Sequence, residues 1–308
     1  MFDAYIAVDW SSANSRSSAR PTRDAIWVGE RLASGVGGSA SAGEAYFRTR
    51  TECWKQLRGR LLRHTSRRLR VFLGFDFAYG YPAGFPSALG LDGELPTWRL
   101  VWEELSRLIS DGDDNHNNRF EVAASLNARC GERQPGPFWG CPQNRRQPTL
   151  STKSPGYPYV VRPDLELERL RLTDRAQRGV QEVWKLYGAG SVGGQALVGI
   201  PVVRGLRYDA RFEAFSRVWP FETGFTREPT PDKGPFILHV EIFPGNVPDP
   251  LDADVAVRDQ AQVRAVARWL SRLDEAEELA QLFTMPNDLA AEARDSCVEE
   301  EGWIIGGT

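Results

Sequence analysis

Two apolar segments that each end on an aspartate restrict the fold of this chain more than any other feature. Residues 5–8 lead into Asp9, and residues 69–75 lead into Asp76. Short apolar runs of this kind are typical of buried strands, and the second is continuous enough for a strand that is covered on both faces. We therefore expect an α/β fold with a mixed sheet flanked by helices, in which two strands deliver carboxylates to one place.

Weaker sequence patterns predict the other strands and helices and their order along the chain. Residues 25–29 and 45–47 are predicted strands, and an amphipathic helix with Thr51 as its N-cap follows them. A late strand over 235–244 carries Glu241, and a helix from about Asp259 to residue 273 comes next. Further helices are predicted near 97–110, 120–128 and 174–187, with a shorter one at about 275–283.

Length and composition favour one folded unit. The chain has 308 residues, of which 41% are hydrophobic and 26% charged, and this is enough to bury a substantial core. We expect a single domain over 1–308, in which residues 78–235, rich in Gly, Pro and Trp, form an inserted elaboration. The start of the chain lacks a signal-peptide pattern, and no apolar run approaches the length of a membrane span. A soluble cytoplasmic protein that needs no membrane is the expectation.

The strand-end acids are the candidate catalytic residues. Carboxylates packed within a few ångström repel one another unless a cation compensates them. Asp9, Asp76 and Glu241 are therefore predicted ligands of Mg²⁺ or Mn²⁺, and Asp259 is a further candidate acid. Two such ions about 3.5–4 Å apart can support phosphodiester cleavage. Each acid also has a structural alternative, because an aspartate can cap a turn or a helix.

The predicted helix after residue 51 is strongly basic. Its segment contains no acid between residues 53 and 70, and its cations are Lys55, Arg58, Arg60, Arg63, Arg67, Arg68 and Arg70. A formal net charge of −3 excludes a uniformly basic nucleic-acid coat, so a polyanion must meet a local patch. We expect Lys55, Arg58, Arg63 and Arg67 to contact nucleic acid; the alternative is a solvated helix face.

A glycine-rich run over residues 188–193 matches the spacing of a dinucleotide fingerprint. We predict no NAD or FAD site there, because residues 181–185 have a helical pattern and Pro201 limits the helix that must follow. A phosphate-binding nest with Lys185 beside it, and Arg204 and Arg207 downstream, stays open next to a tight structural turn. The cysteines and histidines have no zinc-site spacing, and no nucleophile elbow is present.

The order of strand-Asp, two strands, helix, strand-Asp and a late acidic strand and helix resembles the ribonuclease H-like fold. More closely, IAVDWS at 6–11, GFDFAYGYP at 74–82 and VEIFP at 240–244 resemble an uncharacterised bacterial family of predicted ribonuclease H-like nucleases. Some members of that family carry labels from cobalamin or molybdopterin-guanine dinucleotide biosynthesis, which no pattern here supports. Further similar blocks are NRF at 118–120, GPFWG at 136–140, VWKLYGAGSVG at 183–193, WPFETG at 219–224 and EGWI at 301–304.

The resemblance implies a divalent-metal-dependent nuclease or phosphodiesterase that acts through Asp9, Asp76 and Glu241, with Asp259 as a fourth acid. Nucleic acid of unspecified type is the expected partner, bound by the basic helix and Lys185. Two alternatives remain open. One is a non-catalytic module that binds nucleic acid or protein, and the other is an actin-like ATP phosphotransferase, although neither strand-end aspartate is followed by the Asp-x-Gly loop that the latter requires.

Overall fold

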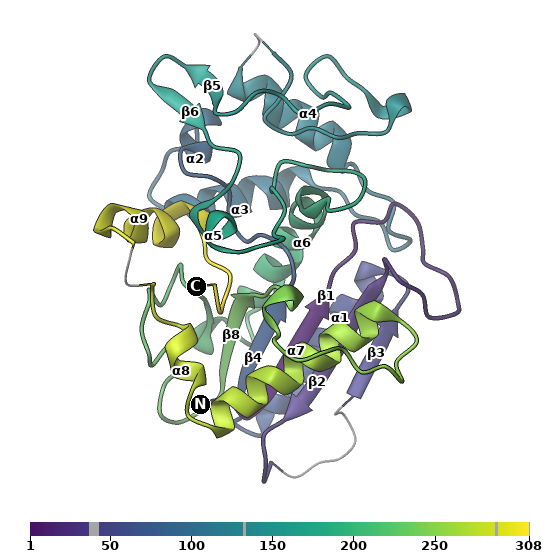
Figure 1. Ribbon diagram of the computed structural model, residues 1–308, viewed down its shortest axis with the longest axis vertical. Coiled ribbons are helices and arrows are strands. Elements are labelled where there is room, and N and C mark those ends of the chain that lie inside the picture. The colour runs from purple at the N-terminus through teal and green to yellow at the C-terminus, as the bar shows by residue number, and fades with distance from the viewer. Residues whose placement is uncertain (37–42, 132–133, 287–288, 308) are drawn as a thin grey trace.

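A mixed six-stranded sheet lies at the centre of the structure, a computed structural model that describes residues 1–36, 43–131, 134–286 and 289–307 (Figure 1). The strand order is β3-β2-β1-β4-β8-β7. The strands are β1 (Ala4–Asp9), β2 (Ile26–Leu32), β3 (Gly43–Phe47), β4 (Arg70–Phe75), β7 (Ser216–Val218) and β8 (Phe236–Glu241). The pairs β1–β2 and β2–β3 are antiparallel, whereas β1, β4, β8 and β7 run parallel. The predicted α/β class, with a mixed sheet flanked by helices, is confirmed.

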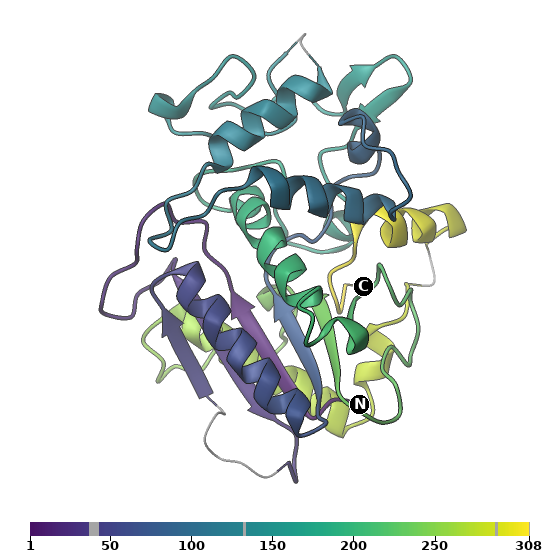
Figure 2. The same cartoon turned by 180° about the vertical axis from the view of Figure 1, so that it is seen from behind.

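Helices cover both faces of this sheet. Helix α7 (Arg258–Glu275) lies on one face, and α1 (Arg50–Ser66) and α6 (Val192–Arg207) lie on the other (Figures 1 and 2). Side chains of β1 alternate between the two cores: Ile6 and Val8 face α1 and α6, while Tyr5 and Ala7 face α7. Burial on both faces explains why the segments leading to Asp9 and Asp76 are almost continuously apolar.

Residues 78–235 contribute most of the remaining elements. They comprise α2 (Phe85–Ala88), α3 (Thr97–Leu108), α4 (Arg119–Cys130), the β5–β6 ribbon (Tyr159–Arg162 and Leu165–Leu167), α5 (Leu172–Ala176), α6 and β7, with short 3₁₀ turns η1 (Gln143–Arg145) and η2 (Glu213–Phe215). Helices α2 and α4 lie beyond one end of the sheet (Figure 1). Trp184 and Phe138 pack edge to face at 5.1 Å, both fully buried, so aromatic residues of this region form core.

The C-terminal part returns to the sheet. After α7 the chain forms α8 (Leu279–Leu282), α9 (Ala291–Ser296) and the π-helical turn η4 (Cys297–Glu301), while the 3₁₀ turn η3 (Pro244–Asn246) follows β8. Ile304 forms a parallel bridge to Glu241, and the amide of Ile305 donates to the carbonyl of Glu241 at 3.0 Å. Within the described residues, none of the helices combines the length and the apolar character needed to cross a membrane.

The prediction of a helix over 174–187 is wrong beyond its first turn. Helix α5 ends at Ala176, and the segment that follows bonds to Trp139: the Trp139 amide donates to the Trp184 carbonyl at 3.0 Å, and the Leu186 amide donates to the Trp139 carbonyl at 2.9 Å. Trp184 and Leu186 are fully buried in the same core, and this burial outweighs the helical pattern of the segment.

Pro201 also does not limit the helix after the glycine-rich run. Helix α6 spans 16 residues and passes through Pro201, because Leu197, Ile200 and Val203 are fully buried and hold it between the sheet and the helical layer. Both reasons for discounting a dinucleotide fingerprint therefore fail. The fingerprint still lacks its buried strand, since Lys185 forms only an isolated bridge to Trp139.

Gly29 of β2 marks the closest approach of α7 to the sheet. A Cβ atom at this position would lie 2.5 Å from the carbonyl oxygen of Val263 in α7. We expect Gly29→Ala to lower the free energy of unfolding by about 1–3 kcal/mol, because the whole helix must shift. Urea unfolding measures this effect.

Gly59 in α1 provides the matched control. A Cβ atom there would meet only the Arg63 guanidinium, at 3.6 Å. Gly59→Ala should raise the free energy of unfolding by about 0.5–1 kcal/mol through higher helix propensity. Equal effects of the two alanines would contradict the close packing of α7 on β2.

Candidate active site

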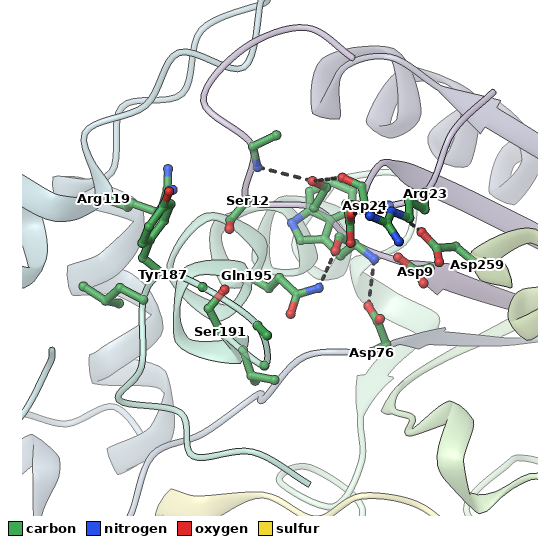
Figure 3. Close-up of a pocket in the computed structure, with 18 residues that line it drawn as sticks. Asp9, Ser12, Arg23, Asp24, Asp76, Arg119, Tyr187, Ser191, Gln195 and Asp259 are labelled. Carbon is green, nitrogen blue, oxygen red and sulfur yellow. Dashed lines mark hydrogen bonds and ion pairs between the residues drawn. The ribbon is translucent and has the colours of Figure 1, made fainter. Parts of the chain in front are cut away.

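A cavity of about 780 Å³ opens at the carboxyl ends of β1 and β4 (Figure 3). Asp9, Asp24, Asp76 and Asp259 gather on one side of it, and Arg119, Tyr187 and Ser191 lie on the opposite side. The remaining lining residues are Trp10, Ser11, Ser12, Ala13, Arg23, Leu186, Gly188, Ala189, Gly190, Val192 and Gln195. The strand-end acids and the glycine-rich run, which are far apart in sequence, therefore share one cavity.

Parallel pairing of β1 with β4 brings the first two acids together. Val8 is in register with Phe75, so Asp9 and Asp76 emerge side by side. The Asp76 amide donates to the Val8 carbonyl at 3.2 Å, and the Trp10 amide donates to Oδ1 of Asp76 at 2.7 Å. These bonds hold the Asp76 carboxylate at the end of β1.

Asp259 reaches the same place from another element. It lies in the first turn of α7, and its Oδ2 accepts a hydrogen bond from the Asp24 amide at 2.7 Å. Asp24 itself has a positive φ of 58°, a conformation that aspartate tolerates better than most residues. The loop between β1 and β2 is thereby fastened to the start of α7, next to Asp9.

Burial and mutual repulsion raise the pKa values of these acids. Burial raises the pKa of Asp9 well above its usual range, and the charges of Asp76 and Asp259 add to the effect. Burial also raises the pKa of Asp76 to about 7, although the Trp10 amide opposes the shift. The pKa of Asp259 rises through burial too. Asp24 pairs with Arg23 at 3.5 Å, whereas Asp9, Asp76 and Asp259 form no ion pair in the part of the chain that the structure describes.

A hard divalent cation fits this set of donors. Carboxylate oxygens are the ligands that Mg²⁺ and Mn²⁺ prefer, and a cation would remove the repulsion that raises the pKa values. Across residues 1–36, 43–131, 134–286 and 289–307, no group of three or more His, Cys, Asp or Glu is already drawn together as a metal site.

Glu241 is not brought together with Asp9 and Asp76. It is in register with Phe75, one residue before Asp76, so it points to the opposite face of the sheet. Its side chain is buried and accepts hydrogen bonds from Arg171 at 2.6 and 2.8 Å and from the Tyr79 amide at 3.0 Å. Arg171 also pairs with Asp174 at 2.8 Å. Glu241 thus belongs to a buried ion-pair network outside the cavity.

The cations expected to bind nucleic acid lie away from the cavity lining. Arg58 pairs with Asp209 at 2.7 Å, whereas Lys55 and Arg63 are exposed on α1, and Arg67 follows that helix. Lys185 donates to the Ala189 carbonyl at 2.5 Å and so fastens the glycine-rich run. Downstream, Arg204 pairs with Glu103 and Arg207 with Glu222, away from that run.

Sequence reasoning missed Asp24 and Arg119 as lining residues. Arg119 is only 6% exposed, and its Nη1 donates to Oδ1 of Asn117 at 3.0 Å. Its guanidinium lies 4.3 Å from the centre of the Phe120 ring, and its Nε has no hydrogen-bond partner among the described residues. Burial, with Arg50 nearby, lowers the pKa of Arg119 to about 10. The NRF block at 118–120 pointed to this segment, but the role of the arginine depends on contacts that only the fold reveals.

The two classes of acid should respond oppositely to amide substitution. The pKa of Asp76 is about 7 in the folded state against 3.8 as the ordinary value, so the folded state binds more protons between these values and stability falls as pH rises through them. Asp76→Asn removes this penalty. In EDTA at pH 8 we expect its free energy of unfolding to exceed that of the wild type by more than about 1.4 kcal/mol, with the gap closing below about pH 4.

Glu241→Gln is the comparison. It breaks a buried pair with Arg171, and we expect the free energy of unfolding to drop by about 3–5 kcal/mol. Urea titrations at several pH values measure both variants. Destabilisation by Asp76→Asn at pH 8 would contradict the repulsive acid cluster.

Comparison with known proteins adds no assignment. No family model matches the chain, and neither a curated protein nor a solved structure is significantly similar to it.

Proposed function

We propose that the protein hydrolyses phosphodiester bonds with a divalent cation, Mg²⁺ or Mn²⁺, held by Asp9, Asp76 and Asp259. The observation that carries this proposal is the meeting of three carboxylates, from the ends of β1 and β4 and the start of α7, in one cavity of about 780 Å³, where none of them forms an ion pair with a described residue. Glu241 differs from these three acids, because the buried Arg171 forms an ion pair with it. Arg23, the cation on this side of the cavity, pairs with Asp24, and no described cation pairs with Asp9, Asp76 or Asp259. A cation from solution would compensate their charges.

The cation would supply charge neutralisation at the phosphoryl oxygens and activation of the attacking water. Asp9 and Asp76 lie at the ends of neighbouring strands, and the hydrogen bond from the Trp10 amide fixes the orientation of the Asp76 carboxylate. Asp259 is only half-buried, and its position depends on α7 and on the Asp24 amide. Asp259 replaces Glu241 as the third acid of the proposed site.

Two further observations support the narrower assignment to a ribonuclease H-like nuclease. The element order on which the resemblance rests recurs as β1, β2, β3, α1, β4, then β8 and α7 around one sheet. Helix α1 also begins at the rim of the cavity, where buried Arg50 donates to the carbonyls of Ser11 and Ala13 at 2.9 Å each. Nucleic acid held on the exposed Lys55 and Arg63 of α1 is thus the proposed substrate.

Cleavage of labelled nucleic acid tests this function. The panel contains single-stranded, duplex, hybrid and branched DNA and RNA, each with Mg²⁺, Mn²⁺ or EDTA. We expect cleavage only with metal, and a loss of at least about 100-fold in Asp9→Asn, Asp76→Asn and Asp259→Asn, because each removes a cation ligand.

Asp113→Asn, at an exposed aspartate outside the cavity, is the control and should keep full activity. Metal-independent cleavage that survives in all three variants would argue against the carboxylate site. Salt-sensitive binding by wild-type protein without cleavage of any substrate would instead favour a non-catalytic binding module.

Metal binding should depend on pH in a defined direction. Protons compete with the cation for Asp76, whose pKa is about 7, so the affinity for Mn²⁺ should rise as pH increases from 6 to 8. Calorimetric titration with Mn²⁺ measures this dependence. An affinity that stays constant over this range, or that is unchanged in Asp76→Asn, would contradict coordination by Asp76.

A further inference from the structure

The wall opposite the carboxylates is formed by the start of α6. Ser191 is the N-cap residue of this 16-residue helix, and its side chain makes no capping hydrogen bond. The first amides of a helix lack intrahelical acceptors, and the helix dipole adds positive potential at this end. In α6 the Gly193 amide donates to the Lys185 carbonyl at 3.0 Å, so a ligand would bind to the other amides of the first turn. Gly190, Ser191 and Val192 all line the cavity, and Figure 3 shows Ser191 on the side away from the aspartates. This end of α6 therefore faces the same space as Asp9 and Asp76.

Arg119 provides an independent second feature of this wall. It is a buried cation that lines the cavity, it forms no ion pair among the described residues, and its Nε has no hydrogen-bond partner. A buried charge without a counter-ion is unfavourable unless a ligand supplies the opposite charge. The uncompensated charge of Arg119 in the cavity wall thus points to a missing anion.

Gly194 shows that the two features lie next to each other. A Cβ atom on Gly194, in the first turn of α6, would lie 3.4 Å from Nε of Arg119 and 2.9 Å from Oγ of Ser12. The absence of a side chain lets the arginine and a serine hydroxyl approach the helix start. The Lys185 ammonium does not add a donor for the anion, because it donates to the Ala189 carbonyl.

We propose that the first turn of α6 and Arg119 bind a phosphate group of the substrate, opposite the proposed cation site. Amides at a helix start and a guanidinium are the donors that phosphate oxygens accept best. The substrate class rests on the proposed function: a nucleotide unit that carries a terminal phosphate beside the bond to be cleaved. The cavity volume of about 780 Å³ falls within the range of pockets that hold such small units.

Binding of inorganic phosphate in EDTA tests this subsite without metal or turnover. Isothermal titration calorimetry should detect binding to the wild type, and Arg119→Gln should weaken it at least about tenfold. Arg107→Gln, at an exposed arginine that pairs with Glu104, is the matched control and should bind as the wild type does. An absence of phosphate binding to the wild type, or equal affinity in Arg119→Gln, would overturn the proposal.

Ser191→Asp is a second test variant, which keeps the proposal testable if Arg119→Gln does not fold. Aspartate is a good N-cap residue, so the melting temperature should stay equal or rise, while its charge repels phosphate and abolishes binding. A Ser191→Asp protein that melts normally and binds phosphate with unchanged affinity would also overturn the subsite.

Asp76→Asn separates this proposal from the proposed function. If phosphate lies on α6 and Arg119, its affinity in EDTA should be retained or increased in Asp76→Asn, because a repelling charge is gone. Phosphate binding that needs Mn²⁺ and disappears in Asp76→Asn would place the anion on the cation and refute the subsite. Arg119-dependent phosphate binding without hydrolysis of any substrate would refute the proposed function alone.

Competition against phosphate identifies the source of the terminal phosphate. We expect a mononucleotide or an oligonucleotide with a terminal phosphate to compete at least about tenfold better than the same molecule with a terminal hydroxyl. The arm that competes more strongly distinguishes a free nucleotide from a strand end. Equal competition by the hydroxyl-ended molecules would contradict recognition of a terminal phosphate.

Discussion

The pairing of β1 with β4 is the constraint on which the rest of the site depends. Val8 and Phe75 are parallel partners, and both are fully buried. This register fixes Asp9 and Asp76 at adjacent strand ends, where their charges repel each other in a poorly solvated position. A shift of one residue in either strand would send one of the two carboxylates to the other face of the sheet. The apolar strands therefore stabilise a local arrangement that the acids alone would not adopt.

The alternation of side chains between the two faces of the sheet accounts for what could and could not be predicted from sequence. The apolar runs before Asp9 and Asp76 predicted two buried strands with acids at one edge, and the class of fold followed from them. The face of Glu241 could not be predicted, because it depends on the register of β8 against β4, and Arg171, its partner, is 70 residues away in sequence. Asp259 could be predicted as a candidate acid because it lies in the first turn of a helix, and a helix start is indicated by the local sequence.

Other errors also come from long-range contacts. The helical spacing at 181–187 does not indicate the hydrogen bonds between this segment and Trp139. The sequence around Pro201 does not indicate that α6 continues past the proline, because that depends on the burial of the helix in the fold. Arg119 belongs to the same category. Its sequence neighbours predict the start of a helix. Its position beside the first turn of α6 follows only from the packing of α4 and α6 in the fold. Local patterns thus identified elements, and packing decided which side chains face the cavity.

The two walls of the cavity carry opposite charge and are mechanically joined. Gln195 of α6 donates from its side chain to the Trp10 carbonyl, directly after Asp9, and a Cβ atom on Gly199 would overlap the ring of Phe77 next to Asp76. The helix that bears the proposed phosphate subsite is therefore fixed to the strands that bear the acids. Each wall alone is electrostatically unfavourable, because the acids repel one another and Arg119 forms no ion pair with any described residue. A cation bound to a phosphate would neutralise both walls at once, so a substrate that carries both should stabilise the fold more than either ion does alone.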